Sequence, residues 1–134
     1  MSSATVRWVG GKQFIGVDST KHSVVLSTPD EGVGMKPSEL LLVALASCTA
    51  VDVVDILAKK HTPLESLEIS AQAEQDPNPP WTFLKIHLTY RLKGVELTEK
   101  NVSQAIQLSE EKYCSVAATL RGKAEITWSY EILS

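Results

Sequence analysis

PSELLLVALASCTAVDVVDILAKKH, residues 37–61, is the stretch that decides the fold of this chain. Pro37 suits a first helical position, and Glu39 suits the first turn, where negative charge interacts favourably with the helix dipole. Basic residues and then Pro63 mark the other end, so we predict one long helix. Residues 40–46 are apolar on every side, and such a helix must be buried in a core or against a partner.

Cys48 stands at the end of this apolar run, where the apolar half of the helix meets the polar half. A helical wheel places Asp52 and Asp55 on the same face, one and two turns later. Because carboxylates beside a thiol raise its pKa, we expect these two residues to form a solvated face instead of activating the cysteine. Taken alone, a cysteine in such a position is more often a buried structural thiol than a reactive one.

The bulk properties suit one domain, residues 1–134, with a net charge of -3. Lysine and arginine are scattered among acidic residues, which argues against nucleic acid as a partner. The N-terminus lacks the features of a signal peptide, and we expect no apolar stretch to be long enough for a membrane anchor. We therefore expect a cytoplasmic protein without a membrane partner.

The cysteines, Cys48 and Cys114, are expected to be reduced thiols in the cytoplasm. Their separation excludes a C-x-x-C redox motif. The histidines, His22, His61 and His87, show no metal-ligand spacing with one another or with the cysteines. The sequence therefore predicts no metal and no other cofactor.

Hydrophobic alternation and capping residues predict the other elements. Strands are expected at 4–9, 13–18 and 22–27, forming a meander, and at 67–74 and 84–92, forming an antiparallel hairpin. Thr98 caps a helix that should run to about residue 113, Ser115 caps a short helix at 116–121, and a strand closes the chain at 124–132. Residues 110–112 should form a solvated turn. Separate groups of strands and helices predict an α+β fold.

The apolar central helix needs cover on most sides, and one modest sheet covers only one side. A second copy of the chain is the economical source of the remaining cover. We therefore expect a homodimer with a large apolar interface.

Four segments together resemble the OsmC/Ohr superfamily, the osmotically induced and organic-hydroperoxide-resistance proteins. They are PSELLLVALASC, LSEEKYCSVAATLRG, the opening RWVGGKQFIG and the ending EITWSYEI, so the resemblance covers essentially the whole chain. It is nearest to the YhfA-like OsmC branch. The resemblance implies an OsmC-like fold with antiparallel sheets, a long central helix that carries a cysteine, and an intertwined homodimer.

The resemblance also implies a thiol peroxidase that uses no metal or haem. Cys48 would be the peroxidatic cysteine, which attacks an organic hydroperoxide and becomes a sulfenic acid. Cys114 would resolve it as a Cys48–Cys114 disulfide, which a dithiol reductant then opens. This requires the two Cα atoms to approach to roughly 4.4–6.8 Å.

The peroxidase branches place a glutamate at the position held here by Ser38, with Glu39 one residue later as the possible supporting residue. Glu39 is half a circle away from Cys48 on the helical wheel. No arginine lies between residues 15 and 42, so the pKa of Cys48 should stay near or above roughly 8.5 unless a cation comes from elsewhere. Lys112, Arg121 and Arg7 are the candidates.

Two hypotheses follow from the sequence. The first is a cysteine-based peroxidase acting on organic hydroperoxides. The alternative is an OsmC-fold dimer with little turnover, which binds a small apolar ligand or senses oxidation through the same thiols.

Overall fold

The computed structural model describes residues 1–134. The chain divides into two compact units, Met1–Leu41 and Leu42–Ser134, and each is described by itself. The expectation of a single domain stays a prediction.

The N-terminal unit is a three-stranded antiparallel sheet in the order β1-β2-β3, formed by Ala4–Trp8, Gln13–Asp18 and Ser23–Ser27. This confirms the predicted meander. After β3, the backbone of Met35 donates to the Val25 carbonyl at 3.0 Å. A Cβ at Gly34 would lie 2.7 Å from that carbonyl oxygen, so only glycine allows this close approach.

The long helix α1 spans Pro37–Lys59, in agreement with the sequence. Its fully buried positions recur every four residues, at Leu45, Thr49, Val53 and Leu57, and form one stripe. The opposite face is open: Val43, Val51 and Val54 are 45%, 69% and 48% exposed. Within the C-terminal unit, therefore, this apolar helix is covered on one side only.

By length and composition, α1 could cross a membrane, so the expectation that no stretch was long enough for this was wrong. The core helix of a soluble protein meets the same two criteria. In the C-terminal unit one stripe of α1 packs into the hydrophobic core.

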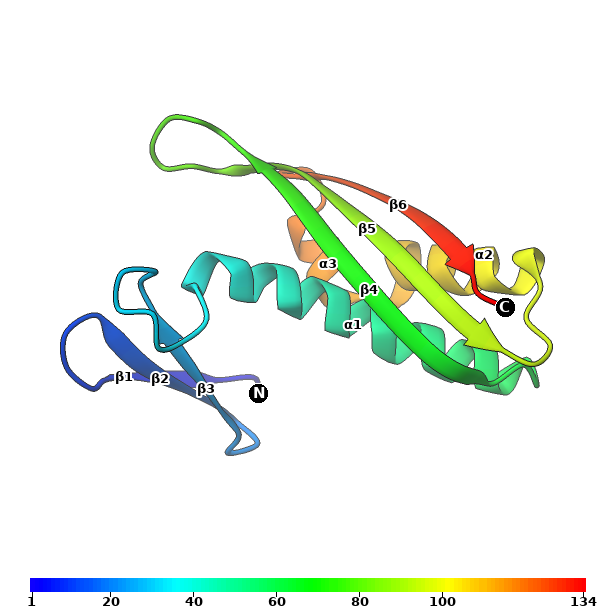
Figure 1. Ribbon diagram of the computed structural model, residues 1–134, viewed down its shortest axis with the longest axis horizontal. Helices are drawn as coiled ribbons and strands as arrows, with labels where there is room; N and C mark the ends of the chain where they lie inside the picture. The colour runs from blue at the N-terminus through cyan, green and yellow to red at the C-terminus, as the bar shows by residue number, and fades with distance from the viewer. The chain divides into compact units, whose positions relative to one another are not determined.

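The C-terminal unit contains a second three-stranded sheet, in the order β4-β5-β6 (Figure 1). β4, Leu64–Gln75, pairs with β5, Phe83–Gly94, as the predicted antiparallel hairpin. β6, Glu125–Ile132, runs parallel to β5. The expectation of purely antiparallel sheets was therefore wrong. Helices connect β5 to β6 and carry the chain back to the start of β5, a crossover that makes the two strands parallel.

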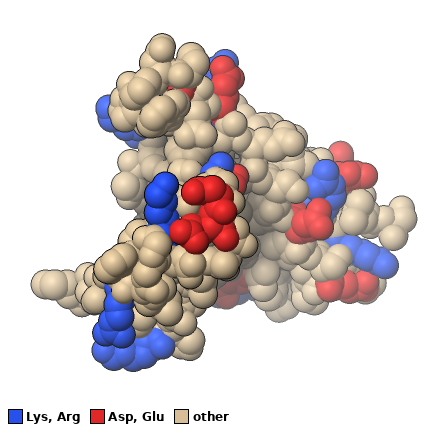
Figure 2. Space-filling view, turned by 60° about the vertical axis from the view of Figure 1, so that its left-hand side comes forward, with Lys and Arg blue, Asp and Glu red and all other residues tan.

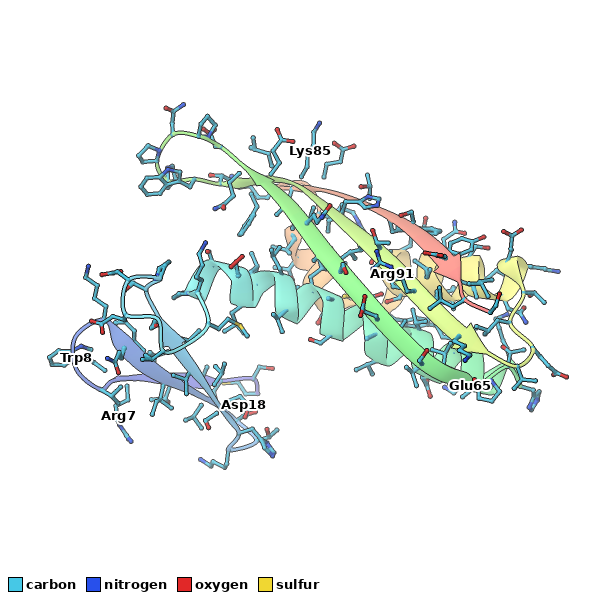
Figure 3. All side chains as sticks on the ribbon, in the orientation of Figure 1. Arg7, Trp8, Asp18, Glu65, Lys85 and Arg91 are labelled. Carbon is cyan, nitrogen blue, oxygen red and sulfur yellow. The ribbon has the colours of Figure 1, made fainter.

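The core of this unit lies between the sheet and its helices, which cover one face of the sheet (Figure 1). The inward residues of β5 alternate as the sequence predicts, and Ile86, Leu88, Tyr90 and Leu92 are fully buried. The other face is polar and carries Lys85 and Arg91 (Figure 3). Figure 2 shows acidic and basic side chains mixed on the face in view, without a stripe of one sign.

The connection from β5 to β6 differs from the predicted long helix. α2, Glu99–Leu108, begins as expected at Thr98, whose hydroxyl accepts from the Asn101 N–H at 3.1 Å. Ser109–Tyr113 then form a π-helix, η1, closed by a hydrogen bond from the Cys114 N–H to the Ser109 carbonyl at 2.8 Å. Such turns are frequent at functional sites.

The short helix α3, Ser115–Leu120, follows directly. Its N-cap is Cys114, whose sulfur accepts from the Ala117 N–H at 3.3 Å, and not Ser115 as the sequence predicts. The sulfur can serve as the cap because η1 ends one residue before it.

Candidate active site

The two cysteines come together from distant parts of the chain. Cys48 lies in the middle of α1 and is half-buried, and Cys114 is 2% exposed at the junction of η1 and α3. Both are free thiols. The Ser115 hydroxyl lies 4.0 Å from the Cys48 sulfur, and the two thiols are near enough for each to shift the pKa of the other. Two thiols and a hydroxyl therefore share one small site.

The environment of Cys48 lowers its pKa. Burial by itself raises this pKa, but the backbone N–H of Val116 and the Cys114 thiol both donate hydrogen bonds that favour the thiolate. The hydroxyl and backbone N–H of Ser115 add to the effect, and together these donors outweigh burial. The start of α3 thus supplies the groups that stabilise the Cys48 thiolate.

Cys114 shifts in the opposite direction. Burial is the main cause that raises its pKa to about 12; the hydrogen bond and charge of Cys48 contribute to this rise, and the Ala117 N–H opposes it. The site therefore makes Cys48 the more easily ionised of the two thiols.

The three basic residues suggested by the sequence have other partners or belong to the other unit. The Lys112 ammonium lies 5.5 Å from the ring centroid of Tyr113. The Arg121 guanidinium donates to the backbone carbonyl of Glu110. Arg7 lies on β1 of the N-terminal unit (Figure 3). The expectation that the Cys48 pKa stays near or above roughly 8.5 without a cation stays a prediction, and the structure adds backbone donors that lower this pKa.

Glu39, the possible supporting residue, lies in the first turn of α1 and is exposed. Its carboxylate is 3.8 Å from the Lys36 ammonium, three residues earlier. Glu39 lies nine positions before Cys48, which places the two side chains on opposite sides of a straight helix.

Of the two aspartates on the Cys48 face, only one is solvated as expected. Asp55 is exposed and forms an ion pair with Lys59 at 2.9 Å. Asp52 is half-buried and accepts a hydrogen bond from the Ser109 hydroxyl at 2.8 Å. The Asp52 side chain is therefore partly exposed to solvent and also hydrogen-bonded to a buried residue of the C-terminal unit.

A chain of buried hydroxyl groups continues inward from Asp52. Ser109 Oγ lies 2.8 Å from Thr49 Oγ1, Thr49 Oγ1 lies 2.8 Å from the Tyr90 hydroxyl, and Tyr90 donates to Glu110 Oε1 at 3.1 Å. Burial raises the pKa of Tyr90 and that of Glu110. The chain thus runs from the Cys48 face of α1 to a buried carboxyl in η1.

The expected solvated turn at residues 110–112 was wrong for Glu110, which is 6% exposed, whereas Glu111 and Lys112 are exposed. The π-helix turns Glu110 inward. The sequence did contain a signal, because Thr49 and Tyr90 are polar residues at inward positions of apolar patterns. Buried polar groups need partners, and Glu110 and Ser109 provide them.

A cavity of about 620 Å³ lies beside Glu110 and not at the thiols. The lining includes Arg121, Lys123, Ile126 and Trp128, and neither cysteine contributes to it. We therefore place the candidate chemistry at the sulfur atoms and not in this cavity.

Known proteins resemble this chain in sequence and in fold. A family model described as "OsmC-like protein" matches residues 28–129. Protein YhfA of Escherichia coli K12 is 34% identical over 131 residues, which are 98% of each chain. The OsmC-like protein of Mycoplasma pneumoniae superposes with a TM-score of 0.86 at 16% identity, over 100% of this chain and 98% of that one. The organic hydroperoxide resistance protein OhrB of Bacillus subtilis has the same fold, with a TM-score of 0.66 at 17% identity over 98% of each chain.

Proposed function

The chain belongs to the OsmC-like protein family, and on that premise we propose that it is a cysteine-based thiol peroxidase that reduces organic hydroperoxides. The family includes proteins named for organic hydroperoxide resistance. The single observation that carries the proposal is that Cys48 and Cys114 lie near enough to shift each other's pKa, with that of Cys48 lowered and that of Cys114 raised. We place this activity in the cytoplasm, where a dithiol reductant can complete the cycle.

In the first step the Cys48 thiolate attacks the O–O bond of the hydroperoxide. A sulfur–oxygen bond forms, the O–O bond breaks, and an alkoxide leaves, which takes up a proton to give the alcohol. Sulfur is oxidised by two electrons to a sulfenic acid as the peroxide is reduced. The lowered pKa of Cys48 supports this role because the thiolate is the nucleophile.

In the second step the Cys114 thiol attacks the Cys48 sulfenic acid, a disulfide forms, and water leaves. In the resting site the neighbouring Cys48 thiolate helps to raise the pKa of Cys114. Oxidation of Cys48 removes this negative charge, so the pKa of Cys114 falls when it is needed as a nucleophile. An external dithiol then reduces the disulfide by thiol–disulfide exchange.

We also propose that the active form is a homodimer. A shallow apolar groove of about 300 Å³ lies between α1 and β4, lined by Val43, Ala46, Ser47, Ala50, Leu67 and Ile69. Together with the open face of α1 at Val51 and Val54, it forms an apolar surface of the kind that a second copy covers.

The experiment that tests the peroxidase uses tert-butyl hydroperoxide with dithiothreitol as the electron donor. Wild-type protein is expected to consume peroxide catalytically, and Cys48→Ser to lose the activity. Cys114→Ser should accumulate a sulfenic acid that dimedone traps at Cys48, as mass spectrometry detects. Equal consumption by wild type and Cys48→Ser would refute the proposal.

The second candidate function is a dimer with little turnover that binds a small apolar ligand or senses oxidation through the same thiols. The observation that favours it is Ser38 at the glutamate position of the peroxidase branches, with Glu39 paired to Lys36. One-turnover disulfide formation without catalytic peroxide consumption would select this candidate.

A further inference from the structure

The Ser115 hydroxyl lies beside Cys48 and is open to solvent. Its oxygen is 4.0 Å from the Cys48 sulfur. Ser115 is exposed and Cys48 is half-buried, whereas Cys114, the other thiol of the site, is 2% exposed. A molecule that reaches the Cys48 sulfur from solvent therefore passes the Ser115 hydroxyl and not the Cys114 thiol.

This hydroxyl has no second partner within the protein. The other side-chain contact at Ser115 involves its backbone carbonyl, which accepts from the Thr119 hydroxyl at 2.7 Å. A hydroxyl group carries one hydrogen, which rotates about the C–O bond. The Ser115 hydroxyl can therefore donate either to the Cys48 sulfur or to an atom bound next to it, and no other contact has to break.

The proposed peroxidase reaction, on which this inference rests, leaves negative charge on an oxygen atom. When the Cys48 thiolate breaks the O–O bond, sulfur binds one oxygen and the second oxygen leaves with the electron pair. A donor aimed at such a developing charge lowers the barrier. Lys112 and Arg121 have other partners, which leaves the hydrogen-bond donors at the sulfur to stabilise the leaving oxygen.

The donors around Cys48 differ in their freedom to turn. The N–H groups of Ser115 and Val116 belong to the backbone at the start of α3, so their direction is fixed by the helix. The Ser115 hydroxyl rotates, and its distance from the sulfur is long for a direct hydrogen bond. An oxygen atom beside the sulfur needs a separation of about 2.7–2.8 Å from a hydroxyl donor, which a gap of 4.0 Å leaves room for.

We propose that Ser115 is a catalytic residue, whose hydroxyl donates a hydrogen bond to the leaving oxygen of the hydroperoxide as Cys48 attacks. The sulfur–oxygen bond forms, the O–O bond breaks, and the leaving oxygen takes the electron pair while it accepts from Ser115. Solvent then protonates the alkoxide to give the alcohol, and Ser115 keeps its own hydrogen. Before the attack the same hydroxyl donates to the thiolate.

The test compares two reactions of Cys48 in the full chain with Cys114→Ser, in which the second thiol cannot react. Oxidation by tert-butyl hydroperoxide, trapped with dimedone, and alkylation by iodoacetamide are followed by mass spectrometry up to the pH at which each rate stops rising. Both reactions need the thiolate, but only the hydroperoxide releases an oxygen anion. The ratio of the two limiting rates therefore reports on the leaving oxygen, at full ionisation of the thiol.

Ser115→Ala should lower the limiting oxidation rate about tenfold and leave the limiting alkylation rate unchanged. This is the size expected for the loss of one hydrogen bond to a charged group. Ser115→Thr keeps a hydroxyl group and should recover most of the oxidation rate. An equal change in both rates, or no change in either, would overturn the proposal, because Ser115 would then act on the thiol alone or not at all.

Thr119→Val is the matched control on the same helix. Thr119 is exposed, and its hydroxyl donates to the Ser115 carbonyl. Its replacement should leave the ratio of the two rates unchanged. Failure of the proposed function has a different signature: Cys48 would be alkylated by iodoacetamide but not oxidised by the hydroperoxide at any pH. Oxidation with the same ratio in Ser115→Ala would overturn the role of Ser115 alone.

Discussion

Replacing Tyr90 with phenylalanine removes one hydroxyl group from the centre of the C-terminal unit. Tyr90 is fully buried on β5, and its hydroxyl lies 2.8 Å from Thr49 Oγ1 and 3.1 Å from Glu110 Oε1. The ring remains, so the change leaves the hydrophobic packing almost intact. It does leave a buried carboxyl without its hydroxyl partner.

The expected cost follows from those two contacts. A buried polar group that loses its partner destabilises a protein by about 1–3 kcal/mol. Thr49 keeps its contact with Ser109, so Glu110 bears most of the loss. For a chain of 134 residues, this corresponds to a melting temperature lower by about 4–12 °C.

Thermal unfolding followed by circular dichroism, at one fixed protein concentration, measures this difference. Tyr130→Phe is the control: Tyr130 is half-buried on β6, stacks on Trp128 at 6.3 Å between ring centroids, and lies outside the hydroxyl chain. It should change the melting temperature little. If Tyr90→Phe costs no more than Tyr130→Phe, the hydroxyl chain does not stabilise the core and the reasoning is refuted. Combining Tyr90→Phe with Thr49→Val should cost less than the sum of the single changes, since the two residues share a contact.

Four further outcomes are expected. The rate of Cys48 alkylation by iodoacetamide should rise with pH and reach half its maximum at a pH below the ordinary thiol pKa, because hydrogen-bond donors lower the pKa of Cys48. A midpoint above the ordinary thiol pKa would contradict the described site. Cys114→Ala should raise the pKa of Cys48, because it removes a hydrogen-bond donor to the thiolate. Cys114→Ser keeps a hydroxyl donor and should leave the pKa of Cys48 unchanged, and thiolate absorbance as a function of pH measures both variants. Leu88→Ala, at a fully buried position, should lower the free energy of unfolding by about 2–5 kcal/mol in urea titrations, compared with a small effect of Leu84→Ala, which is partly exposed. Val51→Asp, on the open face of α1, should turn a dimer into a monomer in light scattering without loss of helical signal, and a wild-type monomer at micromolar concentration would refute the proposed dimer.

Local patterns in the sequence were enough for most of the secondary structure. The capping residues of α1 and the alternation along β5 depend only on neighbours in the chain, and both elements lie where they were predicted. The direction of β6 was not predictable in this way. Pairing direction depends on the route of the connecting helices, and the residues of a strand carry little information about it.

The same distinction applies to the candidate site. The family pattern pointed to Cys48 and Cys114, and the structure brings them near enough for each to shift the pKa of the other. The groups that set their pKa values, the N–H of Val116 and the hydroxyl of Ser115, reach Cys48 from more than sixty residues away. A search of the sequence for nearby cations could not find them, because backbone N–H groups are present at nearly every residue and only position gives them a role.

The sequence by itself thus determined the long apolar helix with its cysteine, the strand pattern and the second cysteine, because these depend on residue type and local spacing. Only the tertiary structure decided that donors at the start of α3 stabilise the Cys48 thiolate, and that Glu110 points inward to close a hydroxyl chain with Asp52. Hydrogen bonds and burial are relations between segments distant in the chain. They come into existence only when α1, β5 and η1 pack together.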